Sequence, residues 1–167
     1  MEGKVKILYT AFNGQDNSSK ILLDKMSVDN VNKLYLRNSF ETSVKQLIDK
    51  LKLKKYELVI SFGQAPLEKD IIKIENLGKK DNNFYKTDFN YSKIKENIEK
   101  IGFKVYISED AGNFLCNNLY YKGLKYIKEN NINCKMIFIH IPKIENISDI
   151  DLLANVLKVT TEIKNKS

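Results

Sequence analysis

The chain has 167 residues, 43% of them hydrophobic, and this length and composition predict one folded domain over residues 1–167 rather than a disordered segment. There are 28 lysines and arginines against 21 acidic residues, but the basic residues are spread along the chain, which argues against a nucleic-acid-binding protein. Neither a signal segment nor an apolar run of the roughly 20 residues that span a membrane is present, so we expect a cytoplasmic protein with reduced cysteines.

The hydrophobic pattern predicts strands and helices in alternation along the chain. Strands are expected over 4–10, 32–38, 56–63, 70–75, 103–108 and 134–142. Helices are expected through Leu22, over 40–53, 94–101 and 112–130, and after Ser148, where Ser148 and Asp151 match a capping box. The polar stretch 76–90 is expected to be a loop. This alternation predicts a single-domain α/β fold, a three-layer α/β/α sandwich with a largely parallel, mixed sheet.

This layout brings one cysteine close to the only histidine of the chain. A helix from Gly112 to Asn130 carries the chain about 21 Å beyond Cys116, at ~1.5 Å per residue. The strand from Cys134 then returns about 20 Å to His140, at ~3.3 Å per residue. If helix and strand pack antiparallel, Cys116 and His140 lie level with each other. A helix N-terminus favours the thiolate and a histidine can shuttle protons, so the pair predicts a nucleophile with its base, oriented by a third group.

The same residues also have a structural interpretation. Buried cysteines are commonly small hydrophobic side chains, and a histidine at a strand end is commonly a hydrogen-bonded structural residue. Spacing alone therefore leaves both interpretations open for Cys116 and His140. Cys134, at the start of a buried strand, and the tyrosine pair 120–121 are expected to be packing residues.

Two motifs carry a family resemblance. The segment SEDAGNFLCNNLYY runs from Ser108 to Tyr121, and the run FIHIP follows at Phe138 to Pro142. Together they resemble the nucleophile and histidine motifs of the pyroglutamyl peptidase (pyrrolidone carboxyl peptidase) family. The resemblance implies a cysteine peptidase that removes N-terminal pyroglutamate from peptides through a thioester acyl-enzyme. In it Cys116 is the nucleophile, and His140 is the general base and then the general acid.

Two upstream segments extend the resemblance. SFGQAPLEKDIIKIEN is similar to the family's stretch from Gly-Gln-Ala to the catalytic glutamate, which implies that Glu75 orients the imidazole. LYTAFNGQDNSS resembles the family's N-terminal substrate loop but lacks its Pro-Phe element. The resemblance implies that Phe12, Gln64 and Asn17 bind substrate, with Phe12 on a face of the lactam ring and Gln64 at its polar edge. The missing phenylalanine predicts a looser pocket.

The implied partners are peptides with N-terminal pyroglutamate and further copies of the chain, since family members commonly form tetramers. We expect no cofactor, no nucleic acid and no membrane partner, and one histidine with two distant cysteines does not make a zinc site. Two other functions remain open. One is a related thiol amidase or hydrolase with an altered substrate pocket. The other is a catalytically inactive binding domain, whose affinity for nucleic acid would fall steeply with salt.

Overall fold

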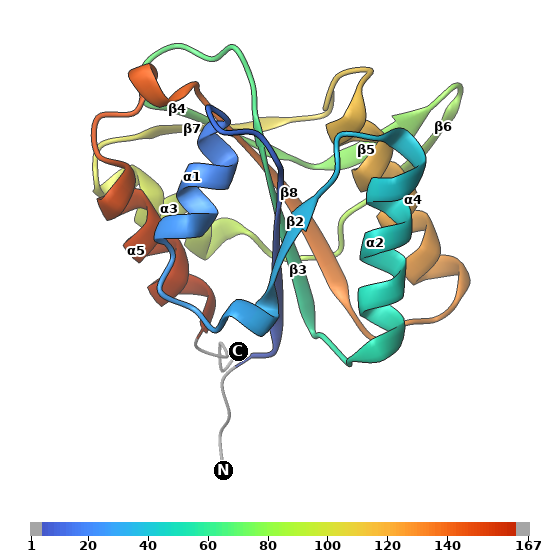
Figure 1. The fold of residues 1–167 in the computed structure, drawn as a ribbon. Coiled ribbons are helices and arrows are strands. Elements are labelled where there is room, and N and C mark those ends of the chain that lie inside the picture. Colours follow the sequence, from blue (N-terminus) through green and yellow to red (C-terminus); the bar gives the residue numbers. More distant parts are fainter. Residues whose placement is uncertain (1–4, 163–167) are drawn as a thin grey trace.

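The computed structural model describes residues 5–162, whose strands form a mixed sheet between two layers of helices (Figure 1). Within these residues the main sheet has six strands in the order β2-β1-β3-β8-β4-β7. Their bounds are β1 Ile7–Phe12, β2 Lys33–Leu36, β3 Leu58–Gln64, β4 Ile71–Glu75, β7 Lys104–Ser108 and β8 Lys135–Ile141. All neighbouring pairs are parallel except β4 and β8. The predicted α/β sandwich with a largely parallel sheet is confirmed.

The helices divide between the two faces of the sheet (Figure 1). Helices α1 (Ser18–Lys25), α3 (Ser92–Lys100) and α5 (Ile150–Glu162) cover one face. Helices α2 (Phe40–Leu53) and α4 (Leu115–Glu129) cover the other. Two short 3-10 turns, η1 (Asn30–Asn32) and η2 (Ile144–Asn146), connect elements. None of the helices described in residues 5–162 has both the length and the apolar composition of a membrane span.

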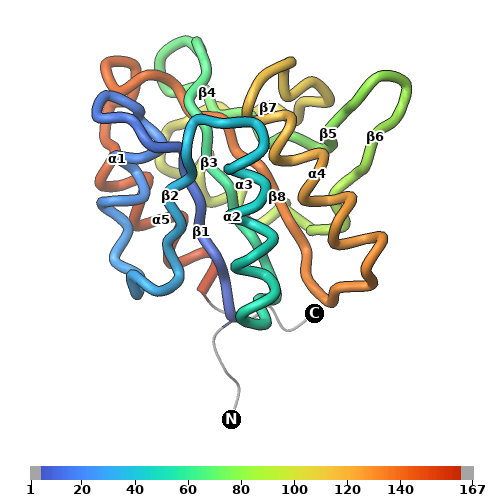
Figure 2. The backbone as a smooth tube through the Cα atoms, turned by 45° about the vertical axis from the view of Figure 1, so that its right-hand side comes forward, coloured from blue at the N-terminus to red at the C-terminus, as the bar shows by residue number. Residues whose placement is uncertain are grey.

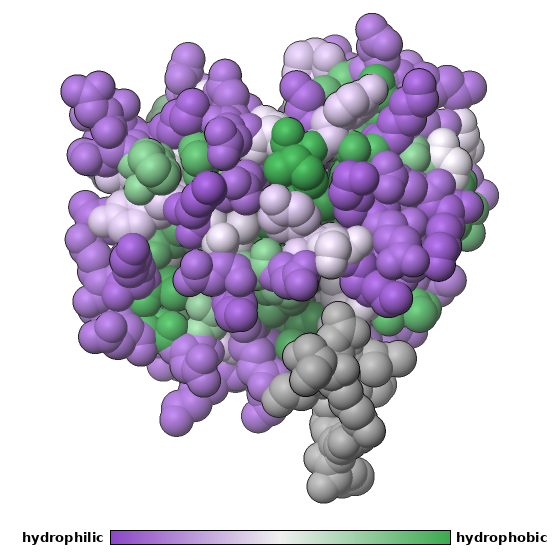
Figure 3. Space-filling view, turned by 180° about the vertical axis from the view of Figure 1, so that it is seen from behind, coloured by the Kyte–Doolittle hydropathy of each residue, from purple (hydrophilic) through white to green (hydrophobic). Residues whose placement is uncertain are grey.

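The alternation of side chains along β8 divides the core into two parts. Ile137, Ile139 and Ile141 pack against α1, α3 and α5, whereas Met136 and Phe138 pack beneath α2 and α4. The strand is buried on both faces, as expected for a sheet covered on both sides. The face of the molecule in Figure 3 carries hydrophilic side chains over most of its area, with apolar ones between them.

The expectation of a loop over 76–90 is wrong. A two-stranded antiparallel hairpin lies there, β5 (Leu77–Lys80) and β6 (Asn83–Lys86), and it lies alongside α4 (Figure 2). Gly78 allows this close approach, because a Cβ atom at Gly78 would lie 2.6 Å from the backbone nitrogen of Tyr121. The hairpin strands are short and polar, so their sequence carries little strand signal, and the packing against α4 stabilises them.

Two predicted helix starts also differ from the structure. Helix α4 begins at Leu115 rather than Gly112, because Gly112 has a φ of 88° and cannot continue a helix. The capping box at Ser148 is wrong as well: the Oδ1 atom of Asp149 accepts a hydrogen bond from the backbone nitrogen of Leu152, so Asp149 caps α5. Ser148 instead bonds the carboxylate of Asp70.

Strand β1 begins at Ile7, three residues after the expected start at Lys4, a residue that lies outside the described part of the chain.

Candidate active site

His140 and Glu75 meet across the single antiparallel pair of the described sheet. The register places Glu75 opposite Phe138 and His140 opposite Lys73, so the two side chains lie diagonally on one face. The Nδ1 atom of His140 lies 2.8 Å from the Oε2 atom of Glu75, and the residues are 6% and 1% exposed. Because a carboxylate only accepts hydrogen bonds, Nδ1 carries the proton and Nε2 remains as the basic nitrogen.

Glu75 is held through its main chain as well. The hydroxyl of Tyr120, on α4, donates a hydrogen bond of 2.8 Å to the backbone carbonyl of Glu75. The second carboxylate oxygen, Oε1, is buried and has no hydrogen-bond partner within residues 5–162. An unsatisfied buried polar atom costs about 1–3 kcal/mol, and such costs are concentrated at functional sites.

Cys116 lies directly over β3 at the level of His140. It is the second residue of α4, and a Cβ atom added to Gly63 would lie 2.7 Å from its Sγ atom. The register pairs Gly63 with His140 on the adjacent strand, and the ring of Phe138 also reaches Gly63. The structure therefore brings Cys116, His140 and Glu75 to one face of the sheet, beneath the start of α4.

The electrostatics of Cys116 differ from the expectation of a thiolate stabilised by the helix dipole. Burial, followed by the negative charge of Glu75, raises the pKa of Cys116 to about 12. Phe114, the N-cap residue that precedes α4, makes no side-chain capping hydrogen bond. At neutral pH the thiol therefore needs a proton acceptor to become a nucleophile.

Cys134 has the environment expected of a core residue. It is 7% exposed, packs in the cluster beneath α2 and α4, and burial raises its pKa to about 12. Among residues 5–162, no three or more histidine, cysteine, aspartate and glutamate side chains are grouped to hold a metal ion.

The three predicted substrate residues lie at the carboxyl ends of β1 and β3 and at the start of α1, and all three take part in local structure. Phe12 is 3% exposed and belongs to the core beneath α2 and α4. The Oε1 atom of Gln64 accepts a hydrogen bond of 2.9 Å from the backbone nitrogen of Ser18. The side chain of Asn17 caps α1 by accepting a hydrogen bond of 2.9 Å from the backbone nitrogen of Ser19. Substrate binding by these residues remains a prediction.

An exposed aromatic pair beside Cys116 is a feature that the sequence analysis missed. Phe114, 66% exposed, and Phe40, 46% exposed, meet edge to face with ring centroids 5.4 Å apart. The side-chain amide of Asn118 joins the two helices by donating a hydrogen bond to the carbonyl of Phe40. The position of Phe114 two residues before Cys116 was the available signal, but its partner on α2 is far away in the sequence.

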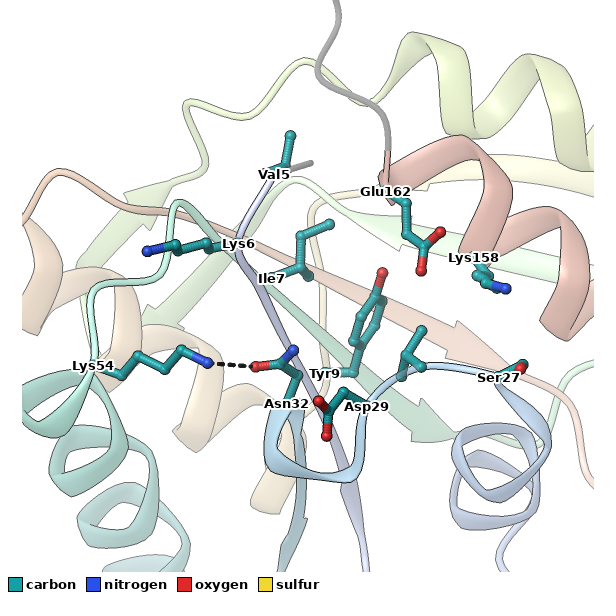
Figure 4. Close-up of a pocket in the computed structure, with 11 residues that line it drawn as sticks. Val5, Lys6, Ile7, Tyr9, Ser27, Asp29, Asn32, Lys54, Lys158 and Glu162 are labelled. Atoms are coloured by element: carbon teal, nitrogen blue, oxygen red, sulfur yellow. Dashed lines mark hydrogen bonds between the residues drawn. The ribbon is translucent and has the colours of Figure 1, made fainter. Parts of the chain in front are cut away.

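A hollow of about 380 Å³ lies at the opposite end of the strands (Figure 4). Its lining includes Lys6 and Ile7 at the start of β1, and Lys54, which donates the hydrogen bond to Asn32 drawn there as a dashed line. Tyr9 also lines it, and burial raises the pKa of Tyr9 to about 12. Ligands of open α/β sheets bind at the carboxyl ends of the strands, where Cys116 and His140 lie, so this hollow is not part of the candidate site.

Comparisons with known proteins identify the family of this chain. The sequence profile of the family described as pyroglutamyl peptidase matches residues 72–165, which include Glu75, Cys116 and His140. The pyrrolidone-carboxylate peptidase of Brachyspira hyodysenteriae is 36% identical over 133 residues, 67% of this chain and 66% of the relative. The pyrrolidone-carboxylate peptidase of a Thermoanaerobacter species is 32% identical over 167 residues, covering 83% of this chain and 82% of the relative.

Solved structures show the same fold. The pyroglutamyl peptidase I of Bacillus amyloliquefaciens superposes with a TM-score of 0.77 over 94% of this chain and 95% of that protein, at 21% identity. The pyrrolidone carboxyl peptidase of Fervidobacterium islandicum superposes with a TM-score of 0.78 over 93% and 96%, at 19% identity. The profile match over more than half of the chain and the relatives above 30% identity show that this chain belongs to the pyroglutamyl peptidase family.

Proposed function

We propose that this chain is a cysteine peptidase that removes N-terminal pyroglutamate from peptides, with Cys116, His140 and Glu75 as its catalytic residues. The observation that carries the proposal is the buried contact of 2.8 Å between His140 and Glu75, at the strand position next to the glycine on which Cys116 rests. Family membership supports the reaction, because the relatives are named pyrrolidone-carboxylate peptidases.

The first step is the transfer of the thiol proton to His140. Burial and Glu75 raise the pKa of Cys116 to about 12, so the thiol is protonated at neutral pH until a base accepts its proton. The same carboxylate stabilises the imidazolium cation that forms when Nε2 of His140 takes the proton. Glu75 thus disfavours an isolated thiolate but favours a thiolate paired with an imidazolium.

The thiolate then attacks the carbonyl carbon of the pyroglutamyl residue. In the resulting tetrahedral intermediate, the imidazolium of His140 gives its proton to the leaving amine, and the carbon–nitrogen bond breaks to leave a thioester on Cys116. Water, deprotonated by His140, attacks the thioester and releases pyroglutamate and the free thiol. Backbone N–H groups in the first turn of α4, which has no side-chain cap, are candidate donors to the oxyanion.

One observation favours a second candidate, a thiol amidase of the same chemistry that accepts a different acyl group. Phe12 is only 3% exposed, and the side-chain oxygen of Gln64 already accepts a hydrogen bond from the backbone nitrogen of Ser18. The N-terminal loop also lacks the Pro-Phe element of the family. A lactam ring would then have fewer protein groups around it than in the relatives, so the acyl preference is the property to be tested.

The test is release of a chromophore from a pyroglutamyl amide by the reduced protein, with prolyl and alanyl amides as matched substrates. We expect turnover of the pyroglutamyl amide alone, and its loss in Cys116→Ser with the fold retained by circular dichroism. Turnover of another acyl amide that also depends on Cys116 would support the second candidate. No turnover of any amide by the folded, reduced protein would contradict both.

A further inference from the structure

The residue after the nucleophile bonds a different part of the chain through both ends of its side-chain amide. The Oδ1 atom of Asn117 accepts a hydrogen bond of 2.9 Å from the backbone nitrogen of Lys79. Its Nδ2 atom donates one of 2.8 Å to the backbone carbonyl of Lys79. The side chain thus pairs with β5 as a neighbouring strand would, and it fixes the hairpin to the first turn of α4.

Tyr120, one helical turn further along α4, makes a third bond to the same segment. Its hydroxyl donates to the carbonyl of Glu75, and its ring is fully buried. Burial raises the pKa of Tyr120, so the hydroxyl keeps the proton that it donates. The ring also lies 5.8 Å, centroid to centroid, from that of Phe138, which lies 4.9 Å from the ring of His140.

These three bonds matter because Glu75 is the last residue of β4. The following residue, Asn76, still bonds β7 through its backbone nitrogen, but the chain then leaves the main sheet to form β5. Gly78 lets the backbone of β5 lie close to that of α4, because the Cβ atom of any larger residue would lie 2.6 Å from the backbone nitrogen of Tyr121. The pairing of β4 with β7 and β8 places Glu75 in the sheet, and the contacts between α4 and residues 75–80 join this strand end to the helix that carries Cys116.

We propose that Asn117 and Tyr120 form a clamp that positions Glu75 for catalysis by joining the nucleophile helix to the strand end that carries the carboxylate. The clamp consists of the bonds of Asn117 to Lys79 and of Tyr120 to Glu75. Neither side chain touches the reacting atoms, and both act through the Glu75–His140 contact. This proposal rests on the proposed function for its kinetic test, but it predicts a structural signature that needs no activity.

The kinetic test is a double-mutant cycle between Tyr120 and Glu75. Tyr120→Phe removes one hydroxyl and keeps the ring, and we expect kcat on the pyroglutamyl amide to fall roughly three- to tenfold with KM little changed. In the Glu75→Gln background the same change should have no further effect on kcat, because the clamp then positions a side chain that has lost its charge. An equal loss of kcat in both backgrounds would mean a general structural role and would overturn the proposal.

Two neighbours provide matched controls. Tyr121→Phe removes a hydroxyl from the adjacent tyrosine, whose ring packs on Tyr85 of the hairpin, and it should leave kcat unchanged. Asn118→Ala removes a bond from α4 to α2 rather than to the hairpin. We expect Asn117→Ala to lower kcat more than Asn118→Ala at equal helix content. Equal effects on kcat of Asn117→Ala and Asn118→Ala would contradict the clamp.

The activity-independent test uses the single histidine of the chain. The proton on Nδ1 of His140, bonded to Glu75, should give one downfield proton NMR signal that disappears in Glu75→Gln. We expect this signal to broaden by faster exchange, or to move, in Tyr120→Phe and to stay unchanged in Tyr121→Phe. An unchanged signal in Tyr120→Phe would overturn the clamp. A changed signal in a protein without turnover would support the clamp and count against the proposed function alone.

Discussion

The two faces of β4 and β8 carry different kinds of side chain, although both faces belong to the same two strands. Toward α1, α3 and α5, the buried residues of both strands are isoleucines: Ile72, Ile74, Ile137, Ile139 and Ile141. Toward α2 and α4, the same strands present Glu75 and His140 beside Phe138, at the edge where α4 begins. One face thus provides apolar packing, and the other holds a buried ionisable pair.

This difference shows how the molecule accommodates a buried carboxylate. Burying polar groups opposes folding unless they are hydrogen-bonded, and the second oxygen of Glu75 has no bond within residues 5–162. The apolar face supplies stabilisation that offsets this cost, because burial of an aliphatic side chain contributes roughly 1.5–3 kcal/mol. Substitutions on the face toward α2 and α4 should therefore affect activity, and substitutions on the face toward α1, α3 and α5 should affect stability.

The largest expected effect follows from removing the base. His140→Ala should abolish turnover, and Cys116 should then react with iodoacetamide at a rate that keeps rising about tenfold per pH unit from roughly pH 7 to 10. The reason is that burial and Glu75 raise the thiol pKa to about 12, so the thiolate fraction grows through this whole range. Mass spectrometry of the peptide containing Cys116 measures the rate separately from that of Cys134. A rate that levels off between about pH 8 and 9, the usual range for a thiol, would show that the raised pKa is wrong.

The next effect concerns the carboxylate. Glu75→Gln keeps the shape of the side chain but loses the charge that stabilises the imidazolium, and we expect kcat to fall by about 10³-fold, with a smaller change in KM. Steady-state kinetics on the pyroglutamyl amide measure this, and circular dichroism shows whether the fold is retained. Less than a threefold change in kcat would remove Glu75 from the proposed mechanism.

A smaller effect, on both stability and activity, is expected at Gly63. A Cβ atom in Gly63→Ala would lie 2.7 Å from Sγ of Cys116 and 2.8 Å from the ring of Phe138, so one of them must move. We expect the free energy of unfolding to fall by about 1–3 kcal/mol, together with a loss of kcat. In the Cys116→Ala background the loss of stability should be smaller, because one of the two contacts is absent. Denaturant unfolding of the four proteins provides the comparison, and an equal loss in both backgrounds would place Sγ away from Gly63.

The smallest effect is expected on the apolar face. Ile139→Val, at a residue 1% exposed next to His140 in the chain, should lower the free energy of unfolding by about 0.5–1.5 kcal/mol and leave kcat unchanged. Urea unfolding and steady-state kinetics of the same preparation test both parts. A large loss of kcat would show that the two faces are not independent.

The sequence predicted the α/β class, and it predicted that Cys116 lies at the level of His140, because both follow from periodicity and element length. The helix begins three residues later than expected, at Leu115, yet the rise of a helix and that of a strand still bring the two residues to the same level. The hairpin at 77–86 was missed, since its strands are stabilised by α4 and not by their own pattern. The raised pKa of Cys116 was not predicted, because burial cannot be read from helix position alone.

By itself, the sequence determined which residues alternate, roughly where the helices and the strands of the main sheet form, and which motifs resemble those of the family, because these depend on residues close together in the chain. Only the tertiary structure decided that β4 lies antiparallel beside β8, and this places Glu75 within hydrogen-bonding distance of His140. It also decided that Tyr120 bonds the last residue of β4 and that Asn117 bonds β5, which follows it. The physical reason is that strand order and side-chain pairing depend on packing between segments distant in the chain, which local periodicity does not encode.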